Sequence, residues 1–377
     1  MRLASPGVSV AREVESLADE WDAAADRAHA VPFLRPGWVA SWWRAFGTGE
    51  LEIHTVRRGN RLAGVLPLHR PARRAPAFKT EPFPLSARTG TLRATANWHV
   101  PKQELLVQDA EAAGELAAAV FDRGAPLVSL AFFGPGQAGF EECLEASRAA
   151  GYRALAYRLS PSPYVDIDGD WESYERSLDP KFCADNRRRE RRLEEAGDVS
   201  VEVADGTERL DELLVEGFRT EPSGWKEKRG SAIASRPATR GFYTDVARWA
   251  AGRGCLRLAF LRVDGRPAAF QLAIEEGGVY YFLKGGFDPA YERFAPARLL
   301  VRAMLGRAFS AGLARFDFLG GAEPWKLEWT TTCQERLLLH AFAPTARGAF
   351  ERLALAHGRP LRARARRRLR ALRDSLR

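Results

Sequence analysis

The chain has 377 residues, of which 46% are hydrophobic and 28% are charged, so it is long enough for about two globular domains. The formal net charge of +9 is misleading, because residues 359–377 contain nine arginines against one acid and the rest of the chain is therefore nearly neutral. This distribution argues against a nucleic-acid-binding surface over the whole folded body.

Cysteine, histidine and apolar patterns exclude further classes. Cys143, Cys183, Cys255 and Cys333 stand far apart, with no Cys-x-x-Cys spacing and no neighbouring histidine. We therefore expect four buried thiols, no disulfide framework and no metal. No apolar run approaches the roughly 20 residues of a membrane span, and the first residues lack the apolar core of a signal peptide, so we expect a cytoplasmic protein.

The first part of the chain predicts helices followed by a hairpin. Apolar spacing indicates helices over residues 10–28 and 38–46, and we expect the tryptophans of the second helix to pack in a core rather than to form a substrate platform. A hairpin is predicted over residues 51–68. His99, just before the next short strand, is expected to be structural, and the alternative is that it lines a substrate cleft.

An internal repeat divides the chain. Residues 51–68 align with residues 256–273 at a constant offset of 205, and in both places a helix and then a strand follow. In the first half, Ser129 stands about where Asp317 lies in the second. The repeat predicts two similar halves, of which the first is degenerate.

The second half opens with a strand over 162–167 and a basic helix. Asp179 and Pro180 are start signals for that helix, and Gly197 is a stop signal. Its arginines and glutamates predict a solvated, ion-paired face. The alternative is that Asn186, Arg187 or Arg188 faces an active cleft and binds an anionic group.

Two helices, over 210–219 and 237–252, precede the segment around which the chain is organised. The loop between them holds Trp225 and Lys226, which have no evident core role, as is typical of functional loops. Strands are then predicted over 256–262, 267–274 and 279–284, followed by a helix from Pro296 to Gly312 and a strand over 314–319.

This order of elements resembles the acyl-CoA half of the GNAT acetyltransferases. Three sets of residues make the resemblance more specific: Gly224-Trp225-Lys226 with Gly230-Ser231-Ala232-Ile233; Lys284 to Asp288; and Phe316-Asp317-Phe318 ahead of Glu323-Pro324-Trp325-Lys326. Together they resemble the branch associated with cellulose or exopolysaccharide biosynthesis (CelD type), which is related to the Fem-type aminoacyltransferases. The resemblance covers roughly residues 30 to 345.

The resemblance implies an α/β (α+β) fold with tandem GNAT-like halves, each a mixed, mostly antiparallel sheet flanked by helices. The expected domains are a degenerate half over 1–158, an acyltransferase half over 159–345 and a basic helical tail over 346–377. Acyl-CoA is the implied co-substrate, with its pyrophosphate at the amino end of the helix that begins near Pro296. The implied cofactor-binding residues are Arg293, Ala295, Ala297, Arg298 and Arg302.

The family's small residues are replaced at Pro296 and Arg298, so we expect the arginines to compensate by direct charge-assisted bonds. We also expect main-chain N–H groups to polarise the thioester where the strands ending near Ile274 and Lys284 part.

The sequence also suggests candidate residues for catalysis and for substrate binding. The catalytic candidates are Asp317 or Glu323 as the base, Lys326 as a holder of a substrate carboxylate or phosphate, and Tyr281 or Tyr291 as the acid for the leaving thiolate. The substrate-binding candidates are Trp225, Lys226, Lys284, Trp325 and Arg187. Aspartate is depleted in strands, and a structural ion pair of Asp317 with Lys284, Lys326 or Arg315 is equally expected.

The implied function is N-acylation of a small amine, such as an amino sugar or another polysaccharide precursor. One alternative is a Fem-like aminoacyl-tRNA-dependent transferase, and another is a non-catalytic accessory protein of exopolysaccharide assembly. Residues 359–377 are expected to contact an anionic membrane, RNA or an acidic partner, or to act as a solubilising arm.

Overall fold

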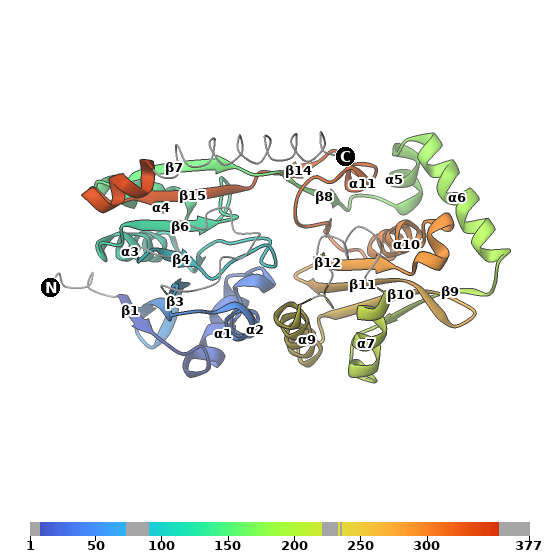
Figure 1. The fold of residues 1–377 in the computed structure, drawn as a ribbon, viewed down its shortest axis with the longest axis horizontal. Helices are drawn as coiled ribbons and strands as arrows, with labels where there is room; N and C mark the ends of the chain where they lie inside the picture. The colour runs from blue at the N-terminus through green and yellow to red at the C-terminus, as the bar shows by residue number, and fades with distance from the viewer. Residues whose placement is uncertain (1–7, 73–89, 221–232, 234–235, 354–377) are drawn as a thin grey trace, which may run out of the picture. The chain divides into compact units, whose positions relative to one another are not determined.

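The computed structural model describes residues 8–72, 90–220, 233 and 236–353, which form two compact units (Figure 1). Among these residues, unit 1 takes those within Met1–Val39, Gly47–Arg158 and Leu337–Arg377. Unit 2 takes those within Ala40–Phe46 and Leu159–Arg336. Each unit has its own sheet and its own buried core.

Unit 1 is built on a mixed sheet. Its strands are β1 (Val8–Ala11), β2 (Glu50–Arg58), β3 (Arg61–Arg70), β4 (Leu92–Ala94), β5 (Leu106–Val107), β6 (Leu127–Ala131), β7 (Arg153–Arg158) and β15 (Leu337–Phe342). They run in the order β1-β2-β3-β4-β6-β15-β7, with β5 paired to β3. Only β4 and β6 pair in parallel among the described strands of this unit, and the rest are antiparallel.

The helices of unit 1 cover that sheet. They are α1 (Ala18–Arg27), α3 (Ala110–Asp122) and α4 (Phe140–Ala149), while α2 (Pro36–Phe46) begins in unit 1 and ends in unit 2. The predicted helix over 10–28 is therefore too long, because Val10 lies in β1 and pairs with His54 of β2. Trp38 and Trp42 of α2 are buried, which confirms their expected role in a core.

Unit 2 is built on a second mixed sheet. Its strands are β8 (Ser162–Asp166), β9 (Val199–Ala204), β10 (Leu256–Val263), β11 (Arg266–Glu276), β12 (Val279–Phe287), β13 (Arg315–Asp317) and β14 (Cys333–Gln334). Their order is β14-β8-β13-β12-β11-β10-β9. Of the described pairs in this sheet, only β12 with β13 is parallel. Two mixed, mostly antiparallel sheets flanked by helices confirm the predicted fold class.

Helices lie on both faces of the unit 2 sheet (Figure 1). They are α5 (Trp171–Ser177), α6 (Pro180–Glu194), α7 (Leu210–Thr220), α9 (Pro237–Gly252), α10 (Pro296–Ser310) and the short α11 (Pro324–Leu327), with the 3-10 turn η5 (Pro289–Phe294) before α10. Ala259 and Leu261 of β10 pack into the cluster that contains α10. Phe270 of β11 instead meets Gly217 of α7, where a Cβ atom would lie 2.4 Å from the ring. Only glycine permits α7 to approach the sheet so closely.

The internal repeat appears in the strand registers. The ladder between β2 and β3 shifts at Val56 and Arg57, and the ladder between β10 and β11 shifts at Leu261 and Arg262. These positions differ by the same offset of 205 that the sequence shows. A β-bulge bends its strand and increases the local twist, so both hairpins bend at the same place.

Helix boundaries in unit 2 follow the expected signals. The Asp179 carboxylate accepts a hydrogen bond of 2.8 Å from the N–H of Phe182, and Pro180 is the first residue of α6. Helix α10 begins at Pro296, and Gly312 just beyond its end has a φ of +62°. A helix end leaves main-chain N–H groups without partners. Asp179 accepts one of them, and a proline in the first turn has no N–H that needs a partner.

The last strand belongs to unit 1. β15 lies between β6 and β7, although its sequence position is within the range 159–345 that the sequence associates with the second half. All six of its residues are buried, and no local pattern identifies its partners. Cys333 is only partly buried, so the expectation of a fully buried thiol is wrong there, whereas Cys143, Cys183 and Cys255 are buried.

Candidate active site

A fork between β12 and β13 organises the candidate site. The two strands pair in parallel from Val279 with Arg315 to Tyr281 with Asp317, and the ladder ends there. β12 continues to Phe287, whereas the chain after Asp317 turns, with Leu319 and Gly320 both at positive φ. The turn directs the chain away from β12, so the strands part beyond Tyr281.

The expected place of parting is therefore wrong by one strand. β11 and β12 pair from Ala269 with Phe287 to Glu276 with Val279, with only a register shift after Leu272. Both strands are long members of an antiparallel hairpin, whose short connection holds them together. β13 joins β12 through the crossover helix α10 and is only three residues long, so the parallel pair is the one that separates.

Asp317 supports the turn that follows β13. Its carboxylate accepts a hydrogen bond of 2.8 Å from the N–H of Leu319, and the residue is 1% exposed. Of the three cations considered as its partner, Arg315 binds Asp166 instead, at 2.8 Å, and the Lys284 ammonium lies 5.4 Å from the Tyr243 ring centroid. The carboxylate thus lies at the fork with one oxygen committed to the main chain.

Lys326 binds the same turn from the other side. Its ammonium donates to the carbonyl of Leu319 at 2.8 Å and to that of Gly321 at 3.1 Å, and lies 3.1 Å from the Glu323 carboxylate. Burial lowers the pKa of Lys326, while the charges of Glu323 and Asp317 oppose that shift. The site is therefore a water-poor region in which charges act at close range.

Arg336 is a second buried cation near Asp317, and no sequence pattern pointed to it. Burial lowers the pKa of Arg336 to about 10, and the negative charge of Asp317 opposes this shift. One guanidinium nitrogen donates to the carbonyl of Ser160 at 3.3 Å. An arginine between two short strands, β14 and β15, carries no motif, so spacing offered no signal for it.

The Trp325 ring packs near one aromatic residue from each side of the fork. Its ring centroid is 6.0 Å from that of Phe282 on β12 and 5.7 Å from that of Phe318 just after β13. The indole N–H donates to the Glu323 carboxylate at 3.1 Å, and 37% of the residue remains exposed. The three rings form an apolar wedge with one edge in solvent.

The structure brings five of the sequence candidates together. Asp317 ends β13, Glu323 precedes α11, Trp325 and Lys326 lie in α11, and Tyr281 pairs with Asp317 at the fork. Tyr281 is buried and Glu323 is half-exposed. Lys284 lies farther along β12, and Trp225 and Lys226 are outside the described residues.

The amino end of α10 carries the cofactor candidates. Ala295 precedes the helix with a φ of +51°, a left-handed conformation that favours glycine, and no side chain caps the helix. Ala297 follows in the first turn, which contains no acidic residue. The guanidinium of Arg293 lies over the Phe294 ring, 4.6 Å from its centroid.

The other two arginines of this set bind acids. Arg298 hydrogen-bonds Asp185 of α6, and Arg302 binds Glu175 of α5 at 2.6 Å and Glu190 of α6 at 2.9 Å. Arginine bonds lower the pKa of Asp185 far below its usual range, with Arg189 making the largest contribution. Arg298 and Arg302 thus connect α10 to α5 and α6. These ion pairs join residues that lie more than 100 positions apart in the sequence.

The basic helix α6 has the ion-paired face that its sequence predicted. Arg187 is largely exposed and lies 3.8 Å from Glu175, while Arg188 binds Asp185. Glu190 contacts Arg302 of α10 rather than an arginine of its own helix. Asn186 of the same helix is buried.

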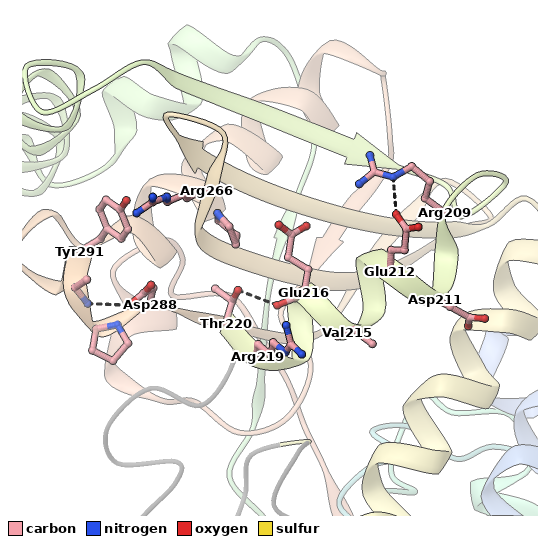
Figure 2. Close-up of a pocket in the computed structure, with 13 residues that line it drawn as sticks. Arg209, Asp211, Glu212, Val215, Glu216, Arg219, Thr220, Arg266, Asp288 and Tyr291 are labelled. Atoms are coloured by element: carbon pink, nitrogen blue, oxygen red, sulfur yellow. Dashed lines mark hydrogen bonds and ion pairs between the residues drawn. The ribbon is translucent and has the colours of Figure 1, made fainter.

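Unit 2 also contains an open groove of about 950 Å³ between α7 and η5 (Figure 2). Its wall on α7 carries Arg219 and Glu216, and Arg266 is the first residue of β11 (Figure 2). Tyr291 is the only residue of this lining among the sequence candidates. Both acidic and basic side chains line the groove, so its charge does not indicate one ligand.

No group of three or more His, Cys, Asp or Glu side chains within the described residues is placed to hold a metal ion. In the same part of the chain, none of the helices combines the length and apolar character needed to cross a membrane.

Comparisons with known proteins agree with the fold. Residues 180–327 match the family profile described as acetyltransferase (GNAT) domain. The crystal structure of FemX superposes with a TM-score of 0.56 at 12% identity, covering 90% of this chain and 98% of FemX. The C-terminal domain (DUF2156) of a putative lysylphosphatidylglycerol synthetase from Agrobacterium fabrum superposes with a TM-score of 0.54 at 15% identity, covering 90% of this chain and 95% of that domain.

A conserved protein of unknown function from Bacteroides thetaiotaomicron gives a TM-score of 0.50 at 12% identity, covering 89% of this chain and 99% of that protein. No curated protein sequence matches this chain significantly. The likeness to solved structures is one of fold, and the CelD-type branch stays a prediction.

Proposed function

We propose that this chain, which carries a GNAT-type acyltransferase domain, transfers an acyl group from a coenzyme A thioester to the amine of a small molecule. The observation that carries the proposal is the parting of β12 and β13 beyond Tyr281 and Asp317. In this proposal an extended donor enters between the parted strands, beside main-chain hydrogen-bonding groups. Two candidates for proton transfer, Tyr281 and Asp317, form the last pair of the ladder before the strands part.

The reaction forms one bond and breaks one. The amine nitrogen attacks the thioester carbonyl, the new C–N bond forms, and the C–S bond breaks to release the thiolate of coenzyme A. The amine proton passes to a base, for which Asp317 and the more exposed Glu323 are the candidates. Tyr281, at the base of the fork, is the candidate that protonates the thiolate.

The residues at α10 fit the donor's pyrophosphate in part. Arg293 makes no ion pair with another described residue, and the uncapped first turn of α10 contains no acid. A helix amino end and one available guanidinium are suited to an anion. Arg298 and Arg302 fit less well, because acids already bind them.

The acceptor side is supported by the exposed edge of Trp325 and by Glu323. An indole face beside a carboxylate suits a small molecule that carries an amine and an apolar or sugar-ring face. An amino sugar or another polysaccharide precursor has this character. Lys284 and Arg187 remain candidates for binding acidic groups on such an acceptor.

Calorimetry and thiol release test the proposal. Acetyl-CoA and longer acyl-CoAs are titrated into the full chain, and release of free thiol is then followed with a panel of amino sugars and amino acids. We expect micromolar to submillimolar binding, within the usual range for enzyme substrates, and thiol release that depends on the amine. Absence of coenzyme A binding at millimolar concentration would refute this donor.

A second candidate is transfer of an aminoacyl group from tRNA. The observation that favours it is the pairing of Arg298 and Arg302 with Asp185, Glu175 and Glu190, which offsets the charge expected to bind a pyrophosphate. Here the expected result is transfer of a labelled amino acid from charged tRNA, with an affinity that falls steeply as salt rises. Thiol release without such transfer would exclude this candidate.

A further inference from the structure

The helix over residues 346–353 presents its apolar side chains to solvent. This helix is the red ribbon that follows β15 in Figure 1. Phe350 is 65% exposed and Leu353 is 50% exposed, whereas Glu351 is buried. A helix that only covers a domain buries its apolar face and exposes its charges, so the exposure of Phe350 and Leu353 and the burial of Glu351 depart from that pattern.

Close packing fixes which face of the helix is turned inward. Gly348 lies against unit 1, where a Cβ atom would meet the carbonyl oxygen of Ala343 at 2.1 Å. Gly348 and Glu351 are three residues apart and share the inward face, and Ala349, Phe350 and Leu353 lie on the other. The outward apolar face is therefore a consequence of tight packing on the opposite side.

Arginines border this apolar face. Arg347 and Arg352 lie on the same helix, and Arg352 also lines a shallow groove in unit 1 with Arg148 of α4 and Arg153 of β7. Leu155, in the same groove, is 38% exposed. None of these four arginines forms an ion pair with another described residue. We call this surface, made of Leu155, Phe350, Leu353 and the four arginines, the arginine–leucine patch.

We propose that the arginine–leucine patch binds the surface of an anionic lipid bilayer. Phe350 and Leu353 enter the boundary between headgroups and acyl chains, and the guanidinium groups bind lipid phosphates. The chain continues beyond the patch with nine arginines against one acid over residues 359–377, which adds attraction to the same surface. Two signals, apolar insertion and charge, are what stable peripheral binding requires.

RNA fits the patch less well than lipid does. An RNA backbone offers phosphates to the arginines, but it offers no apolar phase for Phe350, Leu353 and Leu155 to enter. The proposal is independent of the reaction catalysed in unit 2, because all residues of the patch belong to unit 1.

Vesicle co-sedimentation of the full chain tests the proposal. Vesicles of phosphatidylglycerol mixed with phosphatidylcholine are compared with pure phosphatidylcholine vesicles. The Phe350→Ala, Leu353→Ala double variant is expected to bind the anionic vesicles at least about tenfold more weakly, because the apolar groups that insert are removed. The Arg148→Gln, Arg153→Gln variant is expected to lose affinity for anionic vesicles only.

The matched control is Val201→Ala, Val203→Ala, which shortens two exposed apolar side chains of β9 in unit 2 and is expected to leave binding unchanged. Because Phe350 and Leu353 are exposed, the double variant should keep the melting temperature of the parent. Parent-like vesicle binding by this variant would overturn the proposal, as would loss of binding only when residues 354–377 are removed. RNA binding that exceeds vesicle binding and is insensitive to Phe350→Ala would also overturn it.

Discussion

The ammonium of Lys326 donates a hydrogen bond to the main-chain carbonyl of Leu319, and the two atoms lie 2.8 Å apart. The main-chain N–H of Leu319 donates a hydrogen bond to the Asp317 carboxylate, also at 2.8 Å. Leu319 is thereby held in a left-handed conformation, with a φ of +53°, which costs a residue other than glycine about 1 kcal/mol or more. The two charged side chains at the fork thus shape the turn that separates β13 from β12.

Substitution of Lys326 by methionine should destabilise unit 2. The carbonyls of Leu319 and Gly321 would lose their donor in a buried site, at a cost of about 2–3 kcal/mol. Urea unfolding of the parent and the variant measures this change. Glu323→Gln is the control, because its carboxylate is half-exposed and its loss should cost less than about 1 kcal/mol. Equal stabilities of parent and Lys326→Met would contradict the role assigned to the ammonium.

Asp317→Asn separates catalysis from structure. The asparagine side-chain oxygen can still accept the N–H of Leu319, so we expect the turn to persist. If Asp317 is the base, turnover should fall by roughly 10²–10⁴-fold while acyl-CoA affinity is retained. Thiol release and calorimetry on the same preparation give both quantities. Unchanged turnover would remove Asp317 from the candidates and leave Glu323, for which Glu323→Gln is the corresponding test.

Arg293 and Arg302 should differ in what their loss affects. Arg293→Ala removes an available cation near α10, and we expect acyl-CoA affinity to fall about fivefold to tenfold with little change in stability. Arg302→Ala leaves the carboxylates of Glu175 and Glu190 without their shared cation, so it should cost about 1–3 kcal/mol of stability. Calorimetry and urea unfolding of both variants make the comparison. The reverse pattern would assign the pyrophosphate to Arg302.

Ala295→Gly should stabilise the protein. Ala295 has a φ of +51°, where a Cβ atom is strained, and glycine relieves this strain at some cost in unfolded-state entropy. We expect a net gain of about 0.5–1 kcal/mol in the free energy of unfolding. Ala297→Gly, two residues later and inside α10, should instead destabilise by a similar amount. Two destabilised variants would show that Ala295 is not strained.

A buried charge cluster in unit 1 should make stability depend on pH. Burial alone would raise the pKa of Glu52, but hydrogen bonds from His54 and Arg70 and the charges of Arg70 and Arg123 lower it to about 2. Because the unfolded state binds the proton at a higher pH, this contribution is complete above pH 4.5. It is lost as the pH falls from about 4.5 to about 2.

The size of that contribution is on the order of 3 kcal/mol. Urea unfolding between pH 7 and pH 2.5 should therefore show a shallower pH dependence for Glu52→Gln than for the parent in the acid range. Glu50→Gln on the same strand is the control, because Glu50 is exposed and binds only Arg12 among the described residues. Identical acid profiles for parent and Glu52→Gln would contradict the lowered pKa.

Local signals predicted much of the fold. The hairpins over β2–β3 and β10–β11 follow from alternating residues and tight turns, and the offset of 205 anticipates their shared bulge. Asp179 with Pro180, and Pro296 with Gly312, mark helix ends through the main-chain groups that they satisfy or avoid. All of these features depend on residues within a few positions of each other.

The candidate site was predicted less completely. Asp317, Glu323, Trp325 and Lys326 are near each other in sequence, and the structure keeps them together at the fork. The role of Lys326 in binding the carbonyl of Leu319 depends on a turn that no pattern announces. Arg336 was missed because a buried arginine differs from an exposed one only by its surroundings.

The sequence by itself determined the hairpins and helix ends that have clear local signals, the repeat and the residue types available to the site, because periodicity, turns and caps act over one or two helical turns. Only the tertiary structure decided that β12 parts from β13 rather than from β11, that Arg298 and Arg302 bind acids of α5 and α6, and that β15 returns to unit 1. The physical reason is that strand pairing and ion pairing join residues far apart in the sequence, in β15 and β6 by more than 200 positions. Which residues pair therefore depends on the packing of a whole unit.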